Sequence, residues 1–307
     1  MSGAPVDMSV RLGPLSLRSP MMVASGTFGF GEEYAPYVDF ARLGAVVTKG
    51  VTLRPREGNP GPRIHETAAG ALNAIGLQNP GVERVIEEKL PPLLAAGVPV
   101  IVNIAGEAPE EYVALAERLS GVAGLAALEL NVSCPNVTRG GMEFGRDPQV
   151  LGDLVRAVRD ATPLPLIVKL SPNVSDPVPL AAAALEAGAE ILSLINTLLG
   201  MAIDPRRRRP KLANCTGGLS GPAIKPVALR MVWQVWRALQ PPIIGMGGIM
   251  TGEDAAEFML AGAAAVAVGT ASFVDPTSAE RVGDELEAFC QSQGLPAVAG
   301  LTGALEY

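Results

Sequence analysis

The feature that most constrains this chain is a repeated alternation of short apolar runs with amphipathic stretches. The apolar runs lie at residues 20–24, 45–48, 98–104, 126–130, 164–170, 191–195, 242–246 and 264–268. Short runs that are apolar throughout are typical of strands in a parallel sheet that is covered on both faces. No linker or low-complexity segment divides the series, so we expect residues 1–307 to form a single domain.

The stretches between these runs have the signals of helices. Several open with Pro and carry apolar residues at helical spacing, at residues 109–119, 148–160, 177–187, 222–239, 252–261 and 276–292. Strands that alternate with helices predict parallel βαβ units. Eight such strands in series predict an α/β fold, the TIM (β/α)8 barrel. An open doubly wound sheet is the alternative.

Two long Gly- and Pro-rich insertions interrupt the series, at residues 51–80 after the second strand and at residues 196–221 after the sixth. Both follow strand carboxyl ends, where barrels build their active sites. Aromatic residues make up only 4% of the chain, which leaves Ala, Val, Leu and Ile to form the core. The chain has 35 glycines, and without linkers they indicate tight turns and close backbone approaches to a ligand.

Charge and cysteine content exclude several classes of protein. A net charge of −7 argues against a nucleic-acid binder, and the arginine run at 206–209 is interpreted as a solvated loop. Cys134, Cys215 and Cys290 are widely spaced, which fits a reducing, cytoplasmic setting and provides no metal-binding motif. We expect no signal peptide, because residues 1–10 contain no basic segment that leads into an apolar one. We expect no membrane association, because the charge-free stretch 258–274 is interpreted as buried.

Polar side chains and glycines follow the predicted strands. Lys49 and Lys169 come directly after apolar strands, where a buried charge is costly without an anionic partner. Gly pairs after the seventh strand, and Gly-Thr after the eighth, occupy the place where barrels commonly hold a phosphate. A dinucleotide fingerprint would need glycine at Met250, so a mononucleotide is favoured over directly bound NAD.

Cys134 is the candidate reactive group. It lies in a polar turn after the fourth strand, on the same predicted rim as the two lysines. Cationic surroundings lower the pKa of a thiol, and the thiolate can act as a base or a nucleophile. A buried Cys that packs as a small hydrophobe is the simpler alternative. His65, the single histidine, is interpreted as a solvated loop residue, and a Cys134–His65 pair stays open.

Taken together, the motifs resemble class 1 dihydroorotate dehydrogenases from about residue 10 to residue 273. They are SGT at 25–27, TKG at 48–50, NAIGLQNPG at 73–81, NVSCPN at 131–136, KLSPN at 169–173, NT at 196–197, GGLSG at 217–221 and GG at 247–248. Cysteine at position 134 is the class 1 mark, because the membrane-bound class 2 enzymes use serine. The stretch 196–226 resembles the NAD-linked type 1B catalytic subunit more than the fumarate-linked type 1A.

The resemblance implies a barrel that holds one FMN and oxidises (S)-dihydroorotate to orotate in de novo pyrimidine (UMP) biosynthesis. Cys134 would be the base, and Lys169 would stabilise the reduced flavin. The implied cofactor contacts are Ser25, Lys49, Gly50, Asn103, Asn131, Lys169, Ile195, Gly221, Gly247, Gly248, Gly269 and Thr270. The implied substrate contacts are Lys49, Asn73, Ala74, Ile75, Gly76, Leu77, Asn131, Asn196 and Thr197. No metal is expected.

The resemblance also implies partners. Electrons would pass to NAD+ through a separate subunit that carries FAD and a [2Fe-2S] cluster, and the barrel would form a homodimer within a heterotetramer. Other functions stay open. They are a Schiff-base aldolase barrel with Lys169 as nucleophile, a flavin barrel that acts on pyrimidines or tRNA uridines, and a non-catalytic phosphate-binding barrel. The aldolase interpretation leaves Asn131 and Cys134 without a role.

Overall fold

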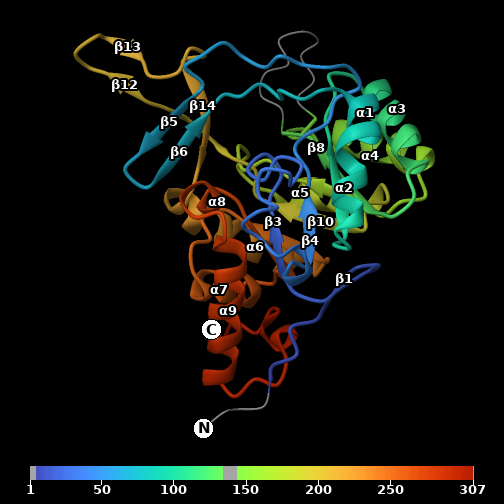
Figure 1. Ribbon diagram of the computed structural model, residues 1–307, viewed down its shortest axis with the longest axis vertical. Coiled ribbons are helices and arrows are strands. Elements are labelled where there is room, and N and C mark those ends of the chain that lie inside the picture. Colours follow the sequence, from blue (N-terminus) through green and yellow to red (C-terminus); the bar gives the residue numbers. More distant parts are fainter. Residues whose placement is uncertain (1–4, 134–143, 307) are drawn as a thin grey trace.

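The centre of the structure is a closed barrel of parallel strands. The computed structural model describes residues 5–133 and 144–306 (Figure 1). Barrel neighbours are also neighbours in the chain, in the order β10-β15-β16-β3-β4-β7-β8-β9. The strands are β3 (Met21–Val23), β4 (Ala45–Val47), β7 (Val100–Ile104), β8 (Leu125–Asn131), β9 (Leu166–Lys169), β10 (Ile191–Leu194), β15 (Ile243–Met246) and β16 (Ala265–Val268). The predicted barrel is confirmed, and the open-sheet alternative is wrong.

Helices surround the barrel. They are α1 (Val82–Arg84), α2 (Leu90–Ala95), α3 (Pro109–Ser120), α4 (Pro148–Ala161), α5 (Val178–Glu186), α6 (Lys225–Leu239), α7 (Gly252–Leu260), α8 (Ala271–Val274) and α9 (Ser278–Ser292). A short π-helical segment, Val85–Lys89, joins α1 to α2. Sequence signals explain their starts: α3 and α4 begin with Pro, and the Asp147 carboxylate accepts from the first amides of α4. Within the described ranges, no helix is both long and apolar enough to cross a membrane.

The connection between β3 and β4 departs from the regular pattern. It contains a short 3-10 turn, Phe40–Arg42, where a (β/α)8 barrel would place an α-helix. Gly29, Gly31 and Pro36 explain this, because both glycines take positive φ and proline disfavours a helix interior. Tyr34 instead donates to the carbonyl of Thr27 at 2.7 Å and stacks on Phe28, which fixes the loop at the carboxyl end of β3.

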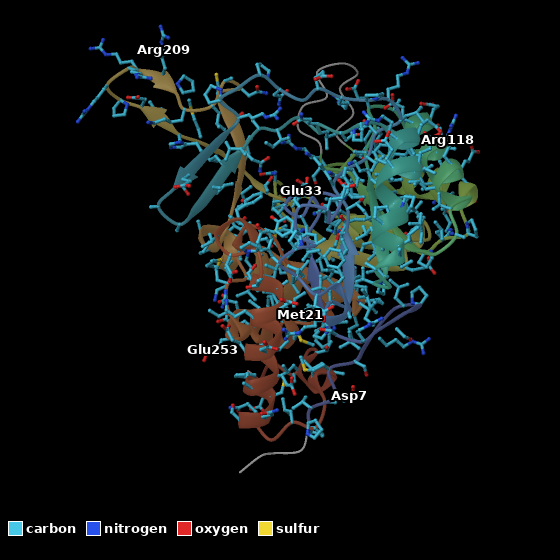
Figure 2. The ribbon with its side chains drawn as sticks, in the orientation of Figure 1. Asp7, Met21, Glu33, Arg118, Arg209 and Glu253 are labelled. Atoms are coloured by element: carbon cyan, nitrogen blue, oxygen red, sulfur yellow. The ribbon has the colours of Figure 1, made fainter. Side chains whose placement is uncertain are left out.

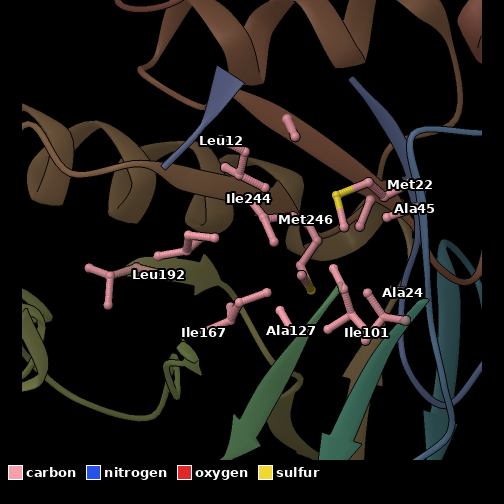
Figure 3. Packing of buried hydrophobic residues seen from close by; sticks show 14 of the residues in the cluster. Leu12, Met22, Ala24, Ala45, Ile101, Ala127, Ile167, Leu192, Ile244 and Met246 are labelled. Atoms are coloured by element: carbon pink, nitrogen blue, oxygen red, sulfur yellow. The ribbon is translucent and has the colours of Figure 1, made fainter. Parts of the chain in front are cut away.

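The amino-terminal end of the barrel is closed by a hairpin, β1 (Val10–Leu12) and β2 (Leu15–Leu17). Its turn lies close to β10, since a Cβ on Gly13 would lie 3.1 Å from Ile191 Cγ1. Figure 3 shows Leu12, Ile244 and Met246 among the packed side chains of the core. The opposite, carboxyl end of the strands is therefore the end available for a ligand.

The two long insertions fold together into an antiparallel sheet, which the sequence did not predict. Its order is β11-β14-β6-β5, with β5 (Ile64–Thr67) and β6 (Gly70–Asn73) from the first insertion and β11 (Leu198–Met201) and β14 (Thr216–Ser220) from the second. Asn73 of β6 pairs with Gly218 of β14. A second small core of Leu72, Ala74 and Leu212 supports this insertion sheet. Figure 1 shows it projecting from one end of the barrel.

A hairpin formed by β12 (Ile203–Asp204) and β13 (Arg209–Pro210) extends beyond the insertion sheet. Residues 206–209 are exposed, and Figure 2 shows Arg209 at an extremity of the molecule. The predicted solvent exposure of this arginine run is confirmed, although Arg209 belongs to strand β13 and not to a loop.

Candidate functional site

A cavity of about 470 Å³ lies between the carboxyl ends of the barrel strands and the insertion sheet, a volume typical of small-molecule sites. The structure brings together most of the predicted site residues in its lining. These are Ser25, Lys49, Gly50, Asn73, Ala74, Ile75, Gly76, Leu77, Asn103, Asn131, Lys169, Asn196 and Thr197. The strand ends supply the floor, and the first insertion supplies one wall.

The floor of the cavity contains a buried charged network. The Lys169 ammonium donates to Ser25 Oγ at 2.8 Å and lies 3.7 Å from Glu129 Oε1. Glu129 Oε1 also accepts from Asn103 Nδ2 at 2.6 Å, and Glu129 Oε2 accepts from Ser193 Oγ at 2.8 Å. Both charged side chains are almost completely buried. A buried charge pair of this kind needs its partners, because each ion alone would cost several kcal/mol of desolvation.

Lys49, which follows β4, supplies a second cation to the cavity lining. Lys49 is half-buried, and burial lowers its pKa below the ordinary 10.5; the nearby Arg63 lowers the pKa further, and Glu33 opposes the shift. Arg63 also lines the cavity, and its guanidinium contacts the carbonyl of Asn59 and the side chain of Gln78. This corner of the cavity therefore favours an anionic group on the ligand.

Side-chain amides hold the edge of the cavity between the fourth and sixth barrel strands. Asn196 Nδ2 donates to Asn131 Oδ1 at 3.2 Å, and Asn196 Oδ1 accepts from the Thr197 amide at 2.8 Å. Asn73 Nδ2 donates to the carbonyl of Gly218 at 3.3 Å, across the β6–β14 pair. The amides thus form a rim of donors and acceptors suited to a planar polar ligand.

Six predicted cofactor residues do not line this cavity. They are Ile195, Gly221, Gly247, Gly248, Gly269 and Thr270. They lie close to one another at the strand ends: a Cβ on Gly248 would lie 2.8 Å from the carbonyl of Gly221, and one on Gly221 would lie 3.5 Å from Thr270 Cγ2. Thr270 Oγ1 also donates to Ser220 Oγ at 2.8 Å, and Ser220 lines the cavity. This cluster of glycines is thus continuous with the cavity at Ser220.

The cluster of glycines lies beside the amino-terminal ends of α6 and α7. Gly221, Gly247 and Gly248 all have positive φ, which glycine adopts without steric cost. A Cβ on any of them would lie 2.8 Å or less from another part of the protein, so the backbones of this cluster pack closely together. Lys225 at the start of α6 donates to Asp254 in the first turn of α7 at 2.6 Å. Backbone amides at helix starts favour anions, so a phosphate group fits this place.

The structure bears differently on the predictions for each of the three cysteines and for the single histidine. Cys134 lies outside the described residues, and Ser133, which precedes it, lines the cavity. Cys290 is buried in α9, as expected for helix packing, and Cys215 is exposed. His65 lies in β5 opposite Leu72, in the insertion sheet, where a loop residue had been predicted. Among the residues that the structure describes, no group of three His, Cys, Asp or Glu side chains is placed to hold a metal ion.

Sequence reasoning did not single out several residues at the cavity. Arg63, Ser133, Ser220 and Phe273 line it, and Glu129 lies beneath its floor. Glu129 carried a detectable signal, since it is a carboxylate inside an otherwise apolar strand, where a charge is expensive. Arg63 carried no such sequence signal, because its position at the cavity depends on how the first insertion folds.

Comparisons with known proteins agree with the geometry. Residues 8–290 match the family model described as dihydroorotate dehydrogenase. The chain is 58% identical over 300 residues to the dihydroorotate dehydrogenase B (NAD(+)) catalytic subunit of Geobacter sp. strain M21, covering 98% of each. It is 59% identical to the subunit of the same name from Pelobacter propionicus, covering 98% of this chain and 99% of that one. A crystal structure of DHODH from Eimeria tenella, in complex with ferulenol, superposes with a TM-score of 0.83 at 26% identity, covering 97% of this chain and 88% of that chain.

Proposed function

Because this chain belongs to the dihydroorotate dehydrogenase family, we propose that it oxidises (S)-dihydroorotate to orotate in the de novo synthesis of UMP, with FMN as its cofactor. The observation that carries the proposal is the cavity, where every residue that the resemblance implied for substrate binding lines one space. The fold alone would not identify the activity, because (β/α)8 barrels catalyse many different reactions.

The residues present fit FMN. Asn103 Oδ1 is buried without a hydrogen-bond partner among the described residues, and its side chain lines the cavity, so it is free to accept from a ring N–H. Lys169 brings a buried positive charge to the same floor, which favours a ligand that gains negative charge on reduction. Gly221, Gly248 and Thr270 would hold the phosphate near the start of α6. Ile195, Gly247 and Gly269 would complete this cofactor set.

The reaction follows from these groups. When bound, FMN supplies the hydride acceptor for the hydrogen on C6 of dihydroorotate. Lys49 attracts the substrate carboxylate, while Asn73, Asn131 and Asn196 orient its polar edges. Cys134 is the base that removes the proton from C5. Residues 73–77 cover the ligand from the insertion sheet and exclude water from the reacting atoms.

The wider setting is proposed with the same function. Residues 1–307 act as one FMN-binding barrel domain in the cytoplasm and form a homodimer. An electron-transfer subunit that carries FAD and [2Fe-2S] passes the electrons to NAD+ and completes a heterotetramer. The relatives are named as catalytic subunits of an NAD(+)-linked dihydroorotate dehydrogenase, which supports such a partner.

A spectroscopic titration tests the activity. The purified chain, loaded with FMN, should show an oxidised flavin spectrum that dihydroorotate bleaches without oxygen, with one orotate formed per flavin reduced. Dihydrouracil, which lacks the carboxylate, is the matched control and should bleach the flavin far more slowly. A protein that takes up no FMN, or whose flavin dihydroorotate leaves oxidised, would overturn the proposal.

A further inference from the structure

The buried carboxylate of Glu129 lies beneath the cavity floor and has no direct role in the proposed reaction. We propose that Glu129 is a positioning residue that fixes the orientation of Asn103 and offsets the charge of Lys169, and thereby sets the reduction potential of the bound flavin. The inference rests on the proposed function, because it requires a flavin above this floor.

The setting of Glu129 argues for a role beyond stability. Its side chain is 0% exposed in β8, between the buried apolar residues Leu128 and Leu130. Replacing a buried ion pair by apolar residues of similar volume is often neutral or stabilising. A carboxylate kept here, with all three of its partners in place, therefore does something that an apolar core would not.

The first consequence concerns Asn103. An ionised carboxylate only accepts hydrogen bonds, so the short contact of 2.6 Å fixes the Asn103 amide with Nδ2 toward Glu129. Asn103 Oδ1 must then point away from Glu129. That oxygen is the buried atom without a partner, and it lies toward Gly50, since a Cβ on Gly50 would be 3.0 Å from it. Glu129 thus presents an acceptor to the ring N–H of a ligand in the cavity.

The second consequence concerns Lys169. Its ammonium lies 3.7 Å from Glu129 Oε1 but is hydrogen-bonded at 2.8 Å to Ser25, which lines the cavity. The carboxylate therefore offsets part of the positive charge without drawing the ammonium away from the cavity. In a buried site the charge left at the floor acts strongly on a ring that gains electrons. Removing the negative charge of Glu129 should make the reduced flavin more stable.

The test is the midpoint potential of the bound flavin, measured by equilibration with a reference dye. Glu129→Gln keeps the volume of the side chain and an acceptor for Asn103, but removes the charge. We expect the two-electron equilibrium to shift toward the reduced flavin by about tenfold, or about 30 mV. Ser193→Ala is the control, because it removes the other partner of Glu129 and leaves every charge in place. It should leave the potential within about 10 mV of the wild type, a shift of about twofold.

A double-mutant cycle separates positioning from general damage. Lys169→Gln should shift the equilibrium toward the oxidised flavin, and Glu129→Gln should still shift it toward the reduced flavin in that background, because the two charges act on the ring independently. A structural role alone would change melting temperature and flavin retention but would leave the potential of the retained flavin unchanged. An unchanged potential in Glu129→Gln, or a shift toward the oxidised flavin in either background, would overturn the inference.

Two further outcomes are distinguishable. If Glu129→Gln fails to fold with flavin, Glu129→Asp withdraws the charge from Lys169 by one methylene and should raise the potential by a smaller amount; no rise there would also overturn the inference. If the wild-type chain holds no flavin, or dihydroorotate does not reduce it, the proposed function itself has failed. A functional wild type with an unshifted Glu129→Gln rejects only the role of Glu129.

Discussion

Lys49 stands at the wall of the cavity as a half-buried cation, and its burial makes a pH dependence predictable. Burial, followed by the nearby Arg63, lowers the pKa of Lys49, so it loses its proton at a lower pH than the ordinary 10.5. The proposed attraction of Lys49 for the carboxylate of dihydroorotate would be lost with that proton. We expect kcat/KM to fall on the alkaline side with an apparent pKa below 10.5.

Lys49→Arg supplies the comparison, because arginine stays protonated throughout this range. The variant should have a lower kcat/KM for dihydroorotate but no alkaline fall in the window where the wild type declines. Measured pH profiles of the two proteins test this directly. Profiles that decline in parallel would assign the titration to a group other than Lys49.

Cys134 follows Ser133, which lines the cavity and donates to the Lys169 carbonyl. Cys134→Ala removes the proposed base and leaves the cofactor residues intact. We expect normal FMN content and a loss of turnover of about a hundredfold or more at neutral pH, the range of a general base. Stopped-flow reduction of the flavin by dihydroorotate measures the step itself. Near-normal reduction rates in the variant would remove Cys134 from the role of base.

Residues at the strand ends were predictable, because the carboxyl ends of parallel strands meet on one face of a barrel. Lys49, Lys169 and Asn131 all follow apolar runs, and the structure places them in one cavity. Arg63 was not predictable in this way, since its approach to the cavity depends on contacts within the first insertion, including Gln78.

At the scale of elements, the insertion sheet shapes one wall of the site. Its β6–β14 pair joins residues 145 positions apart, as in the hydrogen bond between Asn73 and Gly218. Strands as short as β5, with His65 and Glu66, have no apolar period of their own, so periodicity finds the barrel but misses this sheet. The partner strand, rather than the local sequence, makes each of them a strand.

Gly218 is one of the closely packed positions of this sheet, and it gives a test at the element scale. A Cβ at Gly218 would lie 2.1 Å from Thr197 Oγ1 and 2.6 Å from Thr197 Cβ, so Gly218→Ala must displace Thr197. We expect KM for dihydroorotate to rise by about tenfold, the equivalent of about 1.4 kcal/mol, with FMN content unchanged. Gly300→Ala, where a Cβ would meet nothing closer than 3.9 Å, is the control. Equal kinetic constants in the two variants would contradict the proposed role of Thr197.

The ion pair between Lys225 of α6 and Asp254 of α7 gives a second test at the scale of elements. Burial would raise the pKa of Asp254, but hydrogen bonds from Lys225 and from the amides of Met250 and Thr251 outweigh it and hold the pKa below 3.8. The stabilisation is therefore present above pH 3.8 and is lost as the pH falls through the lower, folded-state value. Asp254→Ala should cost about 1–2 kcal/mol at neutral pH, as for a lost helix cap.

Denaturant unfolding at pH 7, repeated at pH values below 3.8, measures that cost and should show it shrinking as the pH falls through the lowered pKa of Asp254. The variant should also bind FMN less tightly. The Met250 and Thr251 amides, at the end of the loop 247–250, donate to the Asp254 carboxylate, so its loss should loosen the loop that carries Gly247 and Gly248. Glu253→Ala is the control, since Glu253 is exposed in the same turn. A cost as small as that of Glu253→Ala would show that Asp254 does not stabilise the two helix starts.

At the scale of the whole molecule, the path of the electrons decides what the chain does alone. The sequence lacks a dinucleotide fingerprint and a C-x-x-C pair, so direct NAD+ binding and a cluster of its own are not expected. We expect the FMN-loaded chain alone to oxidise dihydroorotate with an artificial dye but not with NAD+. Co-purification with the electron-transfer subunit should confer NAD+ reduction at a rate comparable to the dye reaction. Fumarate, assayed with the chain alone, is the control acceptor: turnover with fumarate would favour the type 1A interpretation, and direct NAD+ reduction by the isolated chain would contradict the division of labour between two subunits.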